Sequence, residues 1–549
     1  MAAPHPQAEL IPIRTPKGKA VQKEAPWDPP STPRRDRRAK RLAIGAVAVV
    51  IVILVAAVLF IADYLDERGQ RCAGLEDTAG DGYALSLVDG QCAGWVIERD
   101  YAFGGEDPVV RSIISRITAE NRRVRDLPDH KSYVRIGVMM PMTSAPNSAM
   151  LATEIITALE GAYAAQVYAN NGLRTELGDP VPLVQLVLAN NGLQQELWPS
   201  VVPQLVGLRG NEHPLVAVTG LGVSRPATRD AANALGAERI PTVGAVVTAN
   251  DMTAGWFFKV APSNRDYALA LQKFLAPQAD LGAGYLVYDR NNEDSYVRTL
   301  KESLLEVFGD SFGLADHSRG FTGSLPSEEG TPLLFSESVR DVCALNPGII
   351  FYAGRGRDLD DLINALKTRG TCQSDVRPLL IATGATGLTI SPALLDEARV
   401  ALVDASATDN AGWAGDTSLT SYQTFRQLFT AELGLPEQDL DSGYAILHRD
   451  AVAAVVWAVR RDVAGKIARN QSRGDAPPIA EISTPEDVRN HLFGLPEQPF
   501  PGTAGSCYFR ENPPNGLWPA GKPVPIILAG AQSAALQRVP AYVTGQEAE

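Results

Sequence analysis

The apolar positions of this chain of 549 residues fall into one long uninterrupted run and many short ones. The long run is LAIGAVAVVIVILVAAVLFI at 42–61, and it carries no charged side chain. A helix of about 20 apolar residues can cross a bilayer core, because all its backbone hydrogen bonds are satisfied within the segment. We therefore predict a transmembrane helix over 42–63. A cleaved signal peptide is the alternative, although no small-x-small site is obvious just after the run.

The charges that flank this run set its orientation. A basic cluster at 34–41 precedes it, whereas Asp63, Asp66 and Glu67 follow it. Under the positive-inside rule, the amino-terminal tail lies in the cytoplasm and the rest of the chain lies outside. The tail over 1–41 is rich in proline and poor in large apolar residues, so we predict that it is disordered. The expected localisation is the cell membrane, with a single pass.

A helical period marks the segment after this run. Apolar residues recur at the spacing of one helix face over 107–126. These residues are Val110, Ile113, Ile114 and Ile117. We predict an extracytoplasmic juxtamembrane module over 64–130, whose helix packs on the main body.

From Tyr133 onward, short apolar runs alternate with amphipathic helical segments. A first set of runs is VRIGVMM at 134–140, VPLVQLVLA at 181–189, PLVAVTG at 214–220 and IPTVGAVV at 240–247. A second set is AGYLVYD at 283–289, GIIFYAG at 348–354, PLLIATG at 378–384 and VALVDASA at 400–407. Continuous apolar runs joined by helices indicate parallel strands that are buried on both faces. We predict an α/β fold with two Rossmann-like lobes and a ligand cleft beyond the carboxyl ends of the strands.

Charge and cysteine content limit the possible partners and the cellular compartment. The net charge is −13 although the tail is basic, so the remainder is strongly acidic, which argues against binding to nucleic acid or anionic lipid. All the cysteines follow the long apolar run, on the side of the membrane where disulfides persist. The simplest pairing joins Cys72 to Cys92 and Cys343 to Cys372, and it leaves Cys507 as a free thiol. Spacing alone does not prove this connectivity.

A search for catalytic motifs gives no support for an enzyme. The G-x-S-x-G match at 309–313 follows a helix instead of a strand, so we interpret Gly309 as a helix C-cap. The sequence contains no P-loop and no complete dinucleotide glycine motif. Its histidines form no i, i+4 pair and its cysteines lack C-x-x-C spacing, so we predict neither a metal nor a cofactor.

The order and spacing of several segments resemble the type I periplasmic binding proteins, in particular the branched-chain amino acid-binding receptors of transporters. The resemblance covers about 134–528. It rests on VRIGVMMPMTS, ALEGAYAAQVYANNG, PLVAVTGLGVS, FFKVAPSNRDYALALQKFL, YLVYDRNNEDSY, NPGIIFYAGRGRDLDDLINALKTRG, SGYAILHRDAVAAVVWAV and FRENPPNGLWPAGKPVPIIL.

In this family the backbone crosses between the lobes three times. The resemblance therefore implies a first lobe over 131–258 and 408–500, and a second lobe over 259–407 and 501–549. The membrane anchor, the tail and the extra module differ from the family's usual soluble or lipid-anchored receptors. The high content of alanine, glycine and arginine resembles that of actinobacterial proteins.

The turn after PLVAVTG is the first candidate for ligand binding. Gly220 and Gly222 would let backbone N–H groups approach an anion at the start of the next helix, and Ser224 would add a hydroxyl. By resemblance, this turn holds the α-carboxylate of the ligand. A helix N-cap with glycines for turn geometry is the structural alternative.

Further candidates follow other strands. Val247 and Thr248 match positions that, in the family, present a carbonyl and a hydroxyl to the ligand. An ammonium group needs an anion, and Asp358 is the best match by position, with Asp294 and Asp404 as alternatives. A capping charge at a helix start is the structural alternative for Asp358. Aromatic residues that could stack on a ligand are Tyr288, Tyr296 and Tyr352.

These features predict a binding protein rather than an enzyme. The expected function is capture of a small polar ligand, such as an amino acid or a related compound, for uptake through an ABC-type permease. The alternative is a tethered sensor that signals through its transmembrane helix to a cytoplasmic partner on the tail.

Overall fold

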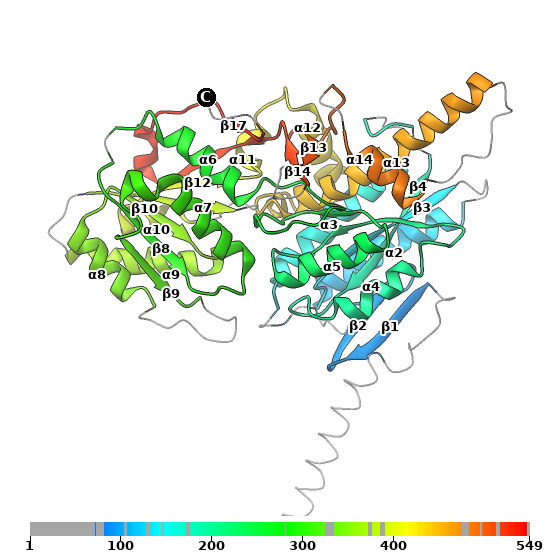
Figure 1. Ribbon diagram of the computed structural model, residues 1–549, viewed down its shortest axis with the longest axis horizontal. Helices are drawn as coiled ribbons and strands as arrows, with labels where there is room; N and C mark the ends of the chain where they lie inside the picture. The colour runs from blue at the N-terminus through cyan, green and yellow to red at the C-terminus, as the bar shows by residue number, and fades with distance from the viewer. Residues whose placement is uncertain are drawn as a thin grey trace, which may run out of the picture. The chain divides into compact units, whose positions relative to one another are not determined.

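In the computed structural model, the chain divides into a unit at 1–66 and a second, compact unit at 67–549 (Figure 1). The structure describes residues 72, 82–103, 107–127, 132–143, 145, 148–171, 176–179, 181–279, 281–323, 334–371, 376–384, 390–473, 483–494, 497–511 and 517–545. The predicted tail at 1–41 and transmembrane helix at 42–63 lie outside these residues. Within them, no helix combines the length and apolar character needed to cross a membrane.

A large mixed sheet forms the core of the first part of the compact unit. Among the described residues it has nine strands, in the order β1-β2-β4-β3-β5-β6-β7-β14-β13. Their bounds are β1 Tyr83–Val88, β2 Gln91–Val96, β3 Tyr133–Met140, β4 Leu183–Asn190, β5 Leu215–Gly220, β6 Thr242–Gly244, β7 Phe257–Lys259, β13 Tyr508–Glu511 and β14 Leu517–Ala520. The central strands β4, β3, β5, β6 and β7 are parallel. Antiparallel hairpins, β1–β2 and β13–β14, extend the sheet at its two edges.

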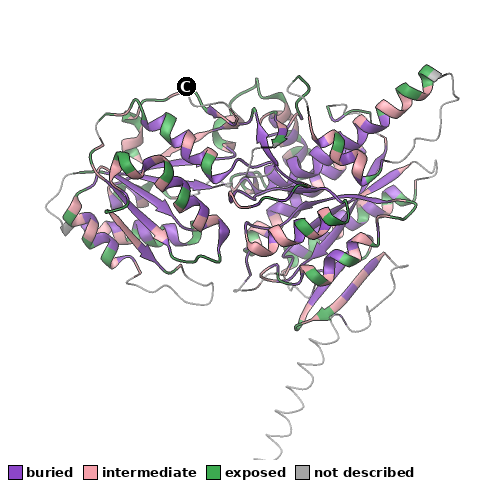
Figure 2. Ribbon diagram, viewed as in Figure 1, coloured by how far each residue is buried: buried purple, intermediate pink, exposed green. Residues whose placement is uncertain are grey.

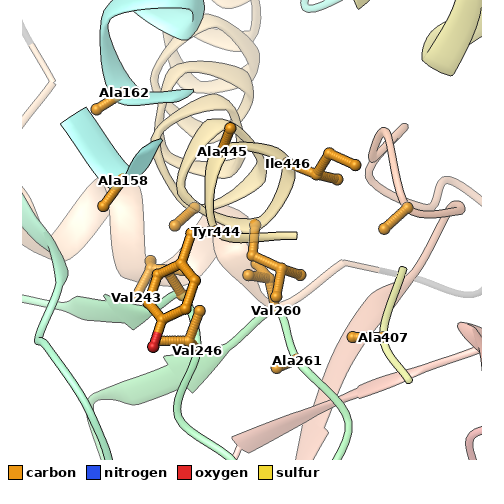
Figure 3. Close-up of a cluster of buried hydrophobic side chains, with 14 of the residues drawn as sticks. Ala158, Ala162, Val243, Val246, Val260, Ala261, Ala407, Tyr444, Ala445 and Ile446 are labelled. Atoms are coloured by element: carbon orange, nitrogen blue, oxygen red, sulfur yellow. The ribbon is translucent and has the colours of Figure 1, made fainter. Parts of the chain in front are cut away.

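The helices that accompany this sheet are drawn around it in Figure 1. They are α2 Pro108–Arg125, α3 Ala152–Asn170, α4 Trp198–Val206, α5 Pro226–Ala237, α13 Tyr444–Arg473 and α14 Pro485–Leu492. Small residues let α3 and α13 approach closely, as Figure 3 shows around Ala158, Ala162 and Ala445. A Cβ atom at Gly161 would lie 2.0 Å from the Ala445 carbonyl oxygen, so a larger residue at 161 would push the helices apart.

A second, smaller sheet has the order β16-β12-β11-β10-β8-β9. Its strands are β8 Gly284–Asp289, β9 Ser318–Phe321, β10 Ile349–Ala353, β11 Leu379–Gly384, β12 Ala401–Ser406 and β16 Ile526–Ala529. They are parallel except for β16, which is antiparallel to β12. The accompanying helices are α6 Asn264–Leu275, α7 Ser295–Phe312, α8 Ser336–Leu345, α9 Gly356–Lys367 and α10 Pro392–Ala398.

Shorter elements complete the described chain. They are α11 Asn410–Ala414, α12 Thr420–Gln427, and a small sheet of β15 Pro523–Val524 and β17 Tyr542–Val543. The short helices η1 Thr368–Thr371, η2 Leu428–Glu432, η3 Glu437–Leu440 and η4 Ala531–Ala535 lie in the connections.

The central strands of both sheets are buried on both faces, as the purple ribbons of Figure 2 show. Every residue of β4, β5, β11 and β12 is buried. Burying a Val, Leu or Ile side chain contributes about 1.5–3 kcal/mol, so these apolar runs are the main source of stability in both sheets. The predicted α/β fold with two largely parallel sheets is confirmed.

The pairing of the last strands differs from the predicted lobe boundaries. Residues 501–549 were assigned to the second lobe, but β13 and β14 pair next to β7 in the nine-stranded sheet. Only β16 from this segment joins the six-stranded sheet. The chain therefore passes between the sheets after β14, and not near residue 500.

The described residues of the predicted juxtamembrane module at 64–130 extend the nine-stranded sheet and pack on it. The hairpin β1–β2 continues this sheet beyond β4, and Asn121 of α2 donates hydrogen bonds to the carbonyls of Ile97 and Leu186. The predicted helix stripe is confirmed, because its apolar residues are all buried. Asp107 caps this helix by accepting from the backbone N–H groups of Val109 and Val110.

The cysteines agree with the predicted pairing as far as they are described. Cys72 and Cys92 form a disulfide, and Cys507 is free and buried. Cys343 is disulfide-bonded, while Cys372 lies outside the described residues. Gly309 was predicted to end its helix, but α7 continues to Phe312. The cap is Gly313, with a left-handed φ of 66°.

Candidate ligand-binding site

A cavity of about 300 Å³ lies beyond the carboxyl ends of strands from both sheets. Residues that follow β5 and β6, together with the starts of α3 and α13, line one side. They include Glu154, Val223, Ser224, Val246, Thr248 and Tyr444. Residues that follow β8 and β10, together with the end of β11, line the other side. They include Tyr296, Arg355, Gly356, Arg357, Asp360 and Thr383. A volume of this size suits a small molecule.

The glycine turn after β5 is held from within the protein. Gly220 and Gly222 both have positive φ, 86° and 62°, which explains the residue type. The Gln195 side chain accepts a hydrogen bond from the Val223 backbone N–H at 3.0 Å and donates one to the Leu221 carbonyl at 3.2 Å. Neither glycine lines the cavity. The turn is therefore braced by Gln195, a residue that no sequence pattern singled out.

Ser224 lines the cavity, and its hydroxyl oxygen is engaged as an acceptor within the protein. It accepts hydrogen bonds from the backbone N–H groups of Thr248 at 3.0 Å and Ala249 at 3.2 Å. Ser224 thus ties the loop after β6 to the turn after β5. Thr248 also lines the cavity, and its Oγ1 atom has no hydrogen-bond partner among the described residues. Val247 is buried in the apolar core and does not line the cavity.

The opposite side of the cavity is organised by an ion pair. Arg355 donates from Nε to Asp294 Oδ2 at 2.7 Å and from Nη2 to Asp294 Oδ1 at 3.0 Å. Asp294 is also the N-cap of α7 and accepts from the Tyr296 backbone N–H at 3.0 Å. The side chains are only 19% and 8% exposed, so this bidentate pair is well shielded from water.

Burial and charge oppose each other at this pair. Burial works to raise the pKa of Asp294, but the neighbouring Arg355 guanidinium outweighs it and holds the pKa below its usual value. Burial likewise works to lower the pKa of Arg355, and Asp294 reverses this and raises it. Both groups are therefore ionised at neutral pH.

Tyr296 lines the cavity and contacts both Thr383 and Arg355. Its hydroxyl donates to the Thr383 carbonyl at 2.5 Å, and the Arg355 guanidinium lies 5.3 Å from its ring centroid. Burial raises the pKa of Tyr296 to about 12, so the phenol stays protonated. Tyr296 was one of the aromatic residues considered for ligand stacking. Tyr352 donates its hydroxyl to the Arg355 carbonyl, and Tyr288 lies under the Lys301 ammonium.

The carboxylates proposed for an ammonium group do not line this cavity. Asp358 is 1% exposed and borders a smaller neighbouring cavity of about 60 Å³ together with Asp289. Asp294 is committed to Arg355, and Asp404 is fully buried within β12. The structure therefore brings Ser224 and Thr248 together, but it does not bring Asp358 to them.

Sequence reasoning missed several residues that do line the cavity. Arg355 and Arg357 follow β10 directly, so the rule that ligands meet strand ends pointed to them as much as to Asp358. Thr383 lies at the end of β11 and carries the same signal. Glu154 and Tyr444 start helices, and no strand-end rule selects them.

Comparison with solved structures finds the same fold. The branched-chain amino acid transporter substrate-binding protein LivJ of Streptococcus pneumoniae, solved with isoleucine, is 14% identical. The similarity covers 75% of this chain and all of LivJ, with a TM-score of 0.51. An ABC transporter substrate-binding protein of Desulfitobacterium hafniense is 18% identical over 72% of this chain and 97% of that protein, with a TM-score of 0.50.

Searches by sequence add no relative, because no protein-family model and no curated protein matches this chain. At these low identities, the similar structures establish the type I periplasmic binding fold and nothing about the ligand.

The chemistry of the cavity suits binding. Its walls offer hydroxyls, two arginines and two carboxylates, with apolar patches at Val223 and Val246. Within the described residues, no group of three or more His, Cys, Asp or Glu side chains is placed to hold a metal ion.

Proposed function

We propose that this chain is a solute-binding protein that captures a small polar ligand in the cavity between its two sheets. The observation that carries the proposal is the lining of the cavity, to which strand ends of both sheets contribute. A ligand that contacts both sides stabilises the arrangement in which the sides are close, and this is how such a protein registers occupancy. Amino acids and related compounds are the first class to test.

We further propose that the protein works outside the cytoplasmic membrane and passes its ligand to an ABC-type permease. The sequence supports this through the apolar run at 42–61 and the basic cluster before it. The disulfide between Cys72 and Cys92 supports an oxidising compartment. The anchor would keep the binding protein near its permease.

The test of binding is a thermal-shift screen of the full-length protein in detergent against amino acids, organic acids, amines, sugars and short peptides. A ligand that binds only the folded state raises the melting temperature, by mass action. The proposal expects a concentration-dependent rise with at least one class. Absence of a rise with every class would contradict it.

The test of delivery is co-purification from the native membrane. Recovery of permease and ATPase subunits is expected. Recovery of a kinase or another regulator in their place would show that the tethered protein signals instead of supplying a transporter.

A further inference from the structure

Two hydroxyls on the cavity wall are available to a ligand. Thr248 follows β6 and Thr383 lies in β11, so they come from different sheets. The two residues are 1% and 6% exposed, and neither Oγ1 atom has a hydrogen-bond partner among the described residues. A buried hydroxyl without a partner costs about 1–3 kcal/mol, so a ligand that bonds to both gains more than exposed hydroxyls would give.

The start of α9 adds backbone donors to the same cavity. Arg355 is the N-cap residue of this helix, and Gly356 is its first residue; both line the cavity. The Arg355 side chain cannot cap the helix, because a guanidinium has no hydrogen-bond acceptor. The Asp358 N–H already donates to the Arg355 carbonyl at 3.1 Å, so the N–H groups of Gly356 and Arg357 and the positive end of the helix dipole favour an anion at this place.

Arg357 supplies a full positive charge beside these donors. It is exposed, it lines the cavity, and no carboxylate lies within ion-pair distance of it among the described residues. Arg355 differs, because Asp294 already neutralises it. An arginine without a partner can bind a carboxylate with two parallel hydrogen bonds.

The carboxylates on the wall are less well placed for an ammonium group. Glu154 Oε2 accepts from the Leu151 backbone N–H at 2.8 Å, so this side chain serves as part of a helix cap. Asp360 lies about one turn further along α9 and is exposed. Neither is a buried anion of the kind that the recognition of an amine requires.

We propose that the cavity binds a small organic acid, whose carboxylate lies at the start of α9 against Arg357 and the Thr383 hydroxyl. The rest of the ligand extends towards Thr248 on the other side. This orientation is the reverse of the one predicted from the sequence, which placed the anionic end on the turn after β5. The proposal rests on the proposed solute-binding function and adds to it the class of ligand: the acid group is required, and an amine is not.

Matched trios of ligands test this requirement on the full-length protein in detergent. One trio is leucine, its deaminated form 4-methylpentanoate and its decarboxylated form 3-methylbutylamine. A second is phenylalanine, 3-phenylpropanoate and 2-phenylethylamine. The acid of at least one trio is expected to raise the melting temperature as much as its amino acid or more, and the amines are expected to raise it not at all.

Three outcomes have distinct meanings. An amino acid that binds at least tenfold more tightly than its deaminated form in calorimetry would overturn the proposal, since the amine would then be recognised. In the wider thermal-shift screen, a rise with amines or sugars alone would overturn it too, while leaving the solute-binding function intact. No rise with any compound of that screen or of the trios would contradict both.

Substitutions locate the carboxylate. Arg357→Gln is expected to weaken binding of the acid by roughly 10- to 100-fold, the usual loss for a hydrogen bond to a charged group. Arg340→Gln is the matched control, because Arg340 is exposed on α8 and does not line the cavity. Equal affinities in these two variants would overturn the placement.

Two more variants separate the proposed anion site from an amine site. Thr383→Val is expected to weaken binding by roughly tenfold, and Thr383→Ser, which keeps the hydroxyl, is expected to retain it. Asp360→Asn is expected to leave the affinity for the acid unchanged or higher. A loss of binding in Asp360→Asn would indicate that Asp360 binds a cationic group, and the proposal would fail.

Discussion

The two sides of the cavity use their polar groups differently. On the side of the nine-stranded sheet, the turn after β5 is held from within the protein, because Gln195 braces it and the Ser224 hydroxyl accepts two backbone N–H groups. The Thr248 Oγ1 atom, on the loop after β6, has no partner among the described residues. On the side of the six-stranded sheet, one charge is neutralised, that of Arg355, while Arg357 and the Thr383 hydroxyl keep their hydrogen-bonding capacity.

The difference distinguishes polar groups that hold the fold together from polar groups that can bind a ligand. A polar group with all its bonds made within the protein contributes to stability and has little left for a ligand. A polar group that lines a cavity and has no hydrogen-bond partner contributes little to stability and much to binding. Substitutions on the two sides should therefore divide between loss of stability and loss of affinity.

The largest expected effect comes from the ion pair. Asp294→Ala should lower the free energy of unfolding by about 3–5 kcal/mol, because it leaves the Arg355 charge shielded and unpaired and removes a helix cap. Chemical denaturation measures this. The double variant Asp294→Leu with Arg355→Met is the control and should recover most of the loss. No recovery would mean that the cap, and not the ion pair, carries the stability.

The same pair predicts the direction of the pH dependence. The pKa of Asp294 is lower in the folded chain than its usual value, so the unfolded chain binds the proton more readily. The stability from the pair is fully present at pH above the usual aspartate range and is lost as the pH falls through the folded pKa. The difference in stability between the wild-type protein and Asp294→Ala should therefore shrink in acid.

The next prediction tests how much the contact with Gln195 stabilises the turn after β5. In Gly222→Val, a Cβ atom would lie 2.6 Å from Gln195 Oε1 on a residue with a φ of 62°, so a loss of about 2–4 kcal/mol is expected. Gly282→Val is the matched control, since its φ is 63° and no atom lies within 4 Å of its added Cβ. The difference between the two variants in chemical denaturation measures the contact with Gln195. Equal losses would mean that backbone strain alone is responsible.

The ends of the predicted strands located the site, but they did not identify which residues line it. The buried strands were predictable because apolar runs such as that of β4 are continuous, and the stripe of α2 was predictable from its period. The hairpin β13–β14 was assigned to the wrong sheet, because its short strands carry no pattern that selects a partner strand.

Individual side chains were harder to predict for a geometric reason. Arg357 and Asp358 are neighbours, but successive residues of a helix point about 100° apart. Arg357 lines the main cavity and also the smaller one beside Asp289, whereas Asp358 lines only the smaller one. No sequence pattern gave this rotation, so the sequence did not predict which of these two charged side chains lines the main cavity.

A smaller effect is expected at Ser224. Ser224→Ala removes the acceptor that holds the backbone N–H groups of Thr248 and Ala249, and both groups are buried. The free energy of unfolding should fall by about 1–3 kcal/mol. Chemical denaturation measures the fall, and Ser224→Thr, which keeps the oxygen, serves as the control. A stable Ser224→Ala protein would show that the loop after β6 is held by other contacts.

The smallest effect on stability is expected at Thr383, and it completes the contrast between the two sides. Its Oγ1 atom has no partner among the described residues, so Thr383→Val removes a buried polar group without breaking a hydrogen bond. The free energy of unfolding of the ligand-free protein should stay the same or rise by up to about 1 kcal/mol. Ser224→Ala is the natural comparison, because it removes a hydroxyl of similar burial from the other side of the same cavity. If Thr383→Val destabilises the ligand-free protein as much as Ser224→Ala does, the Thr383 hydroxyl is part of the scaffold, and the division between a structural turn after β5 and a binding surface at β11 and α9 does not hold.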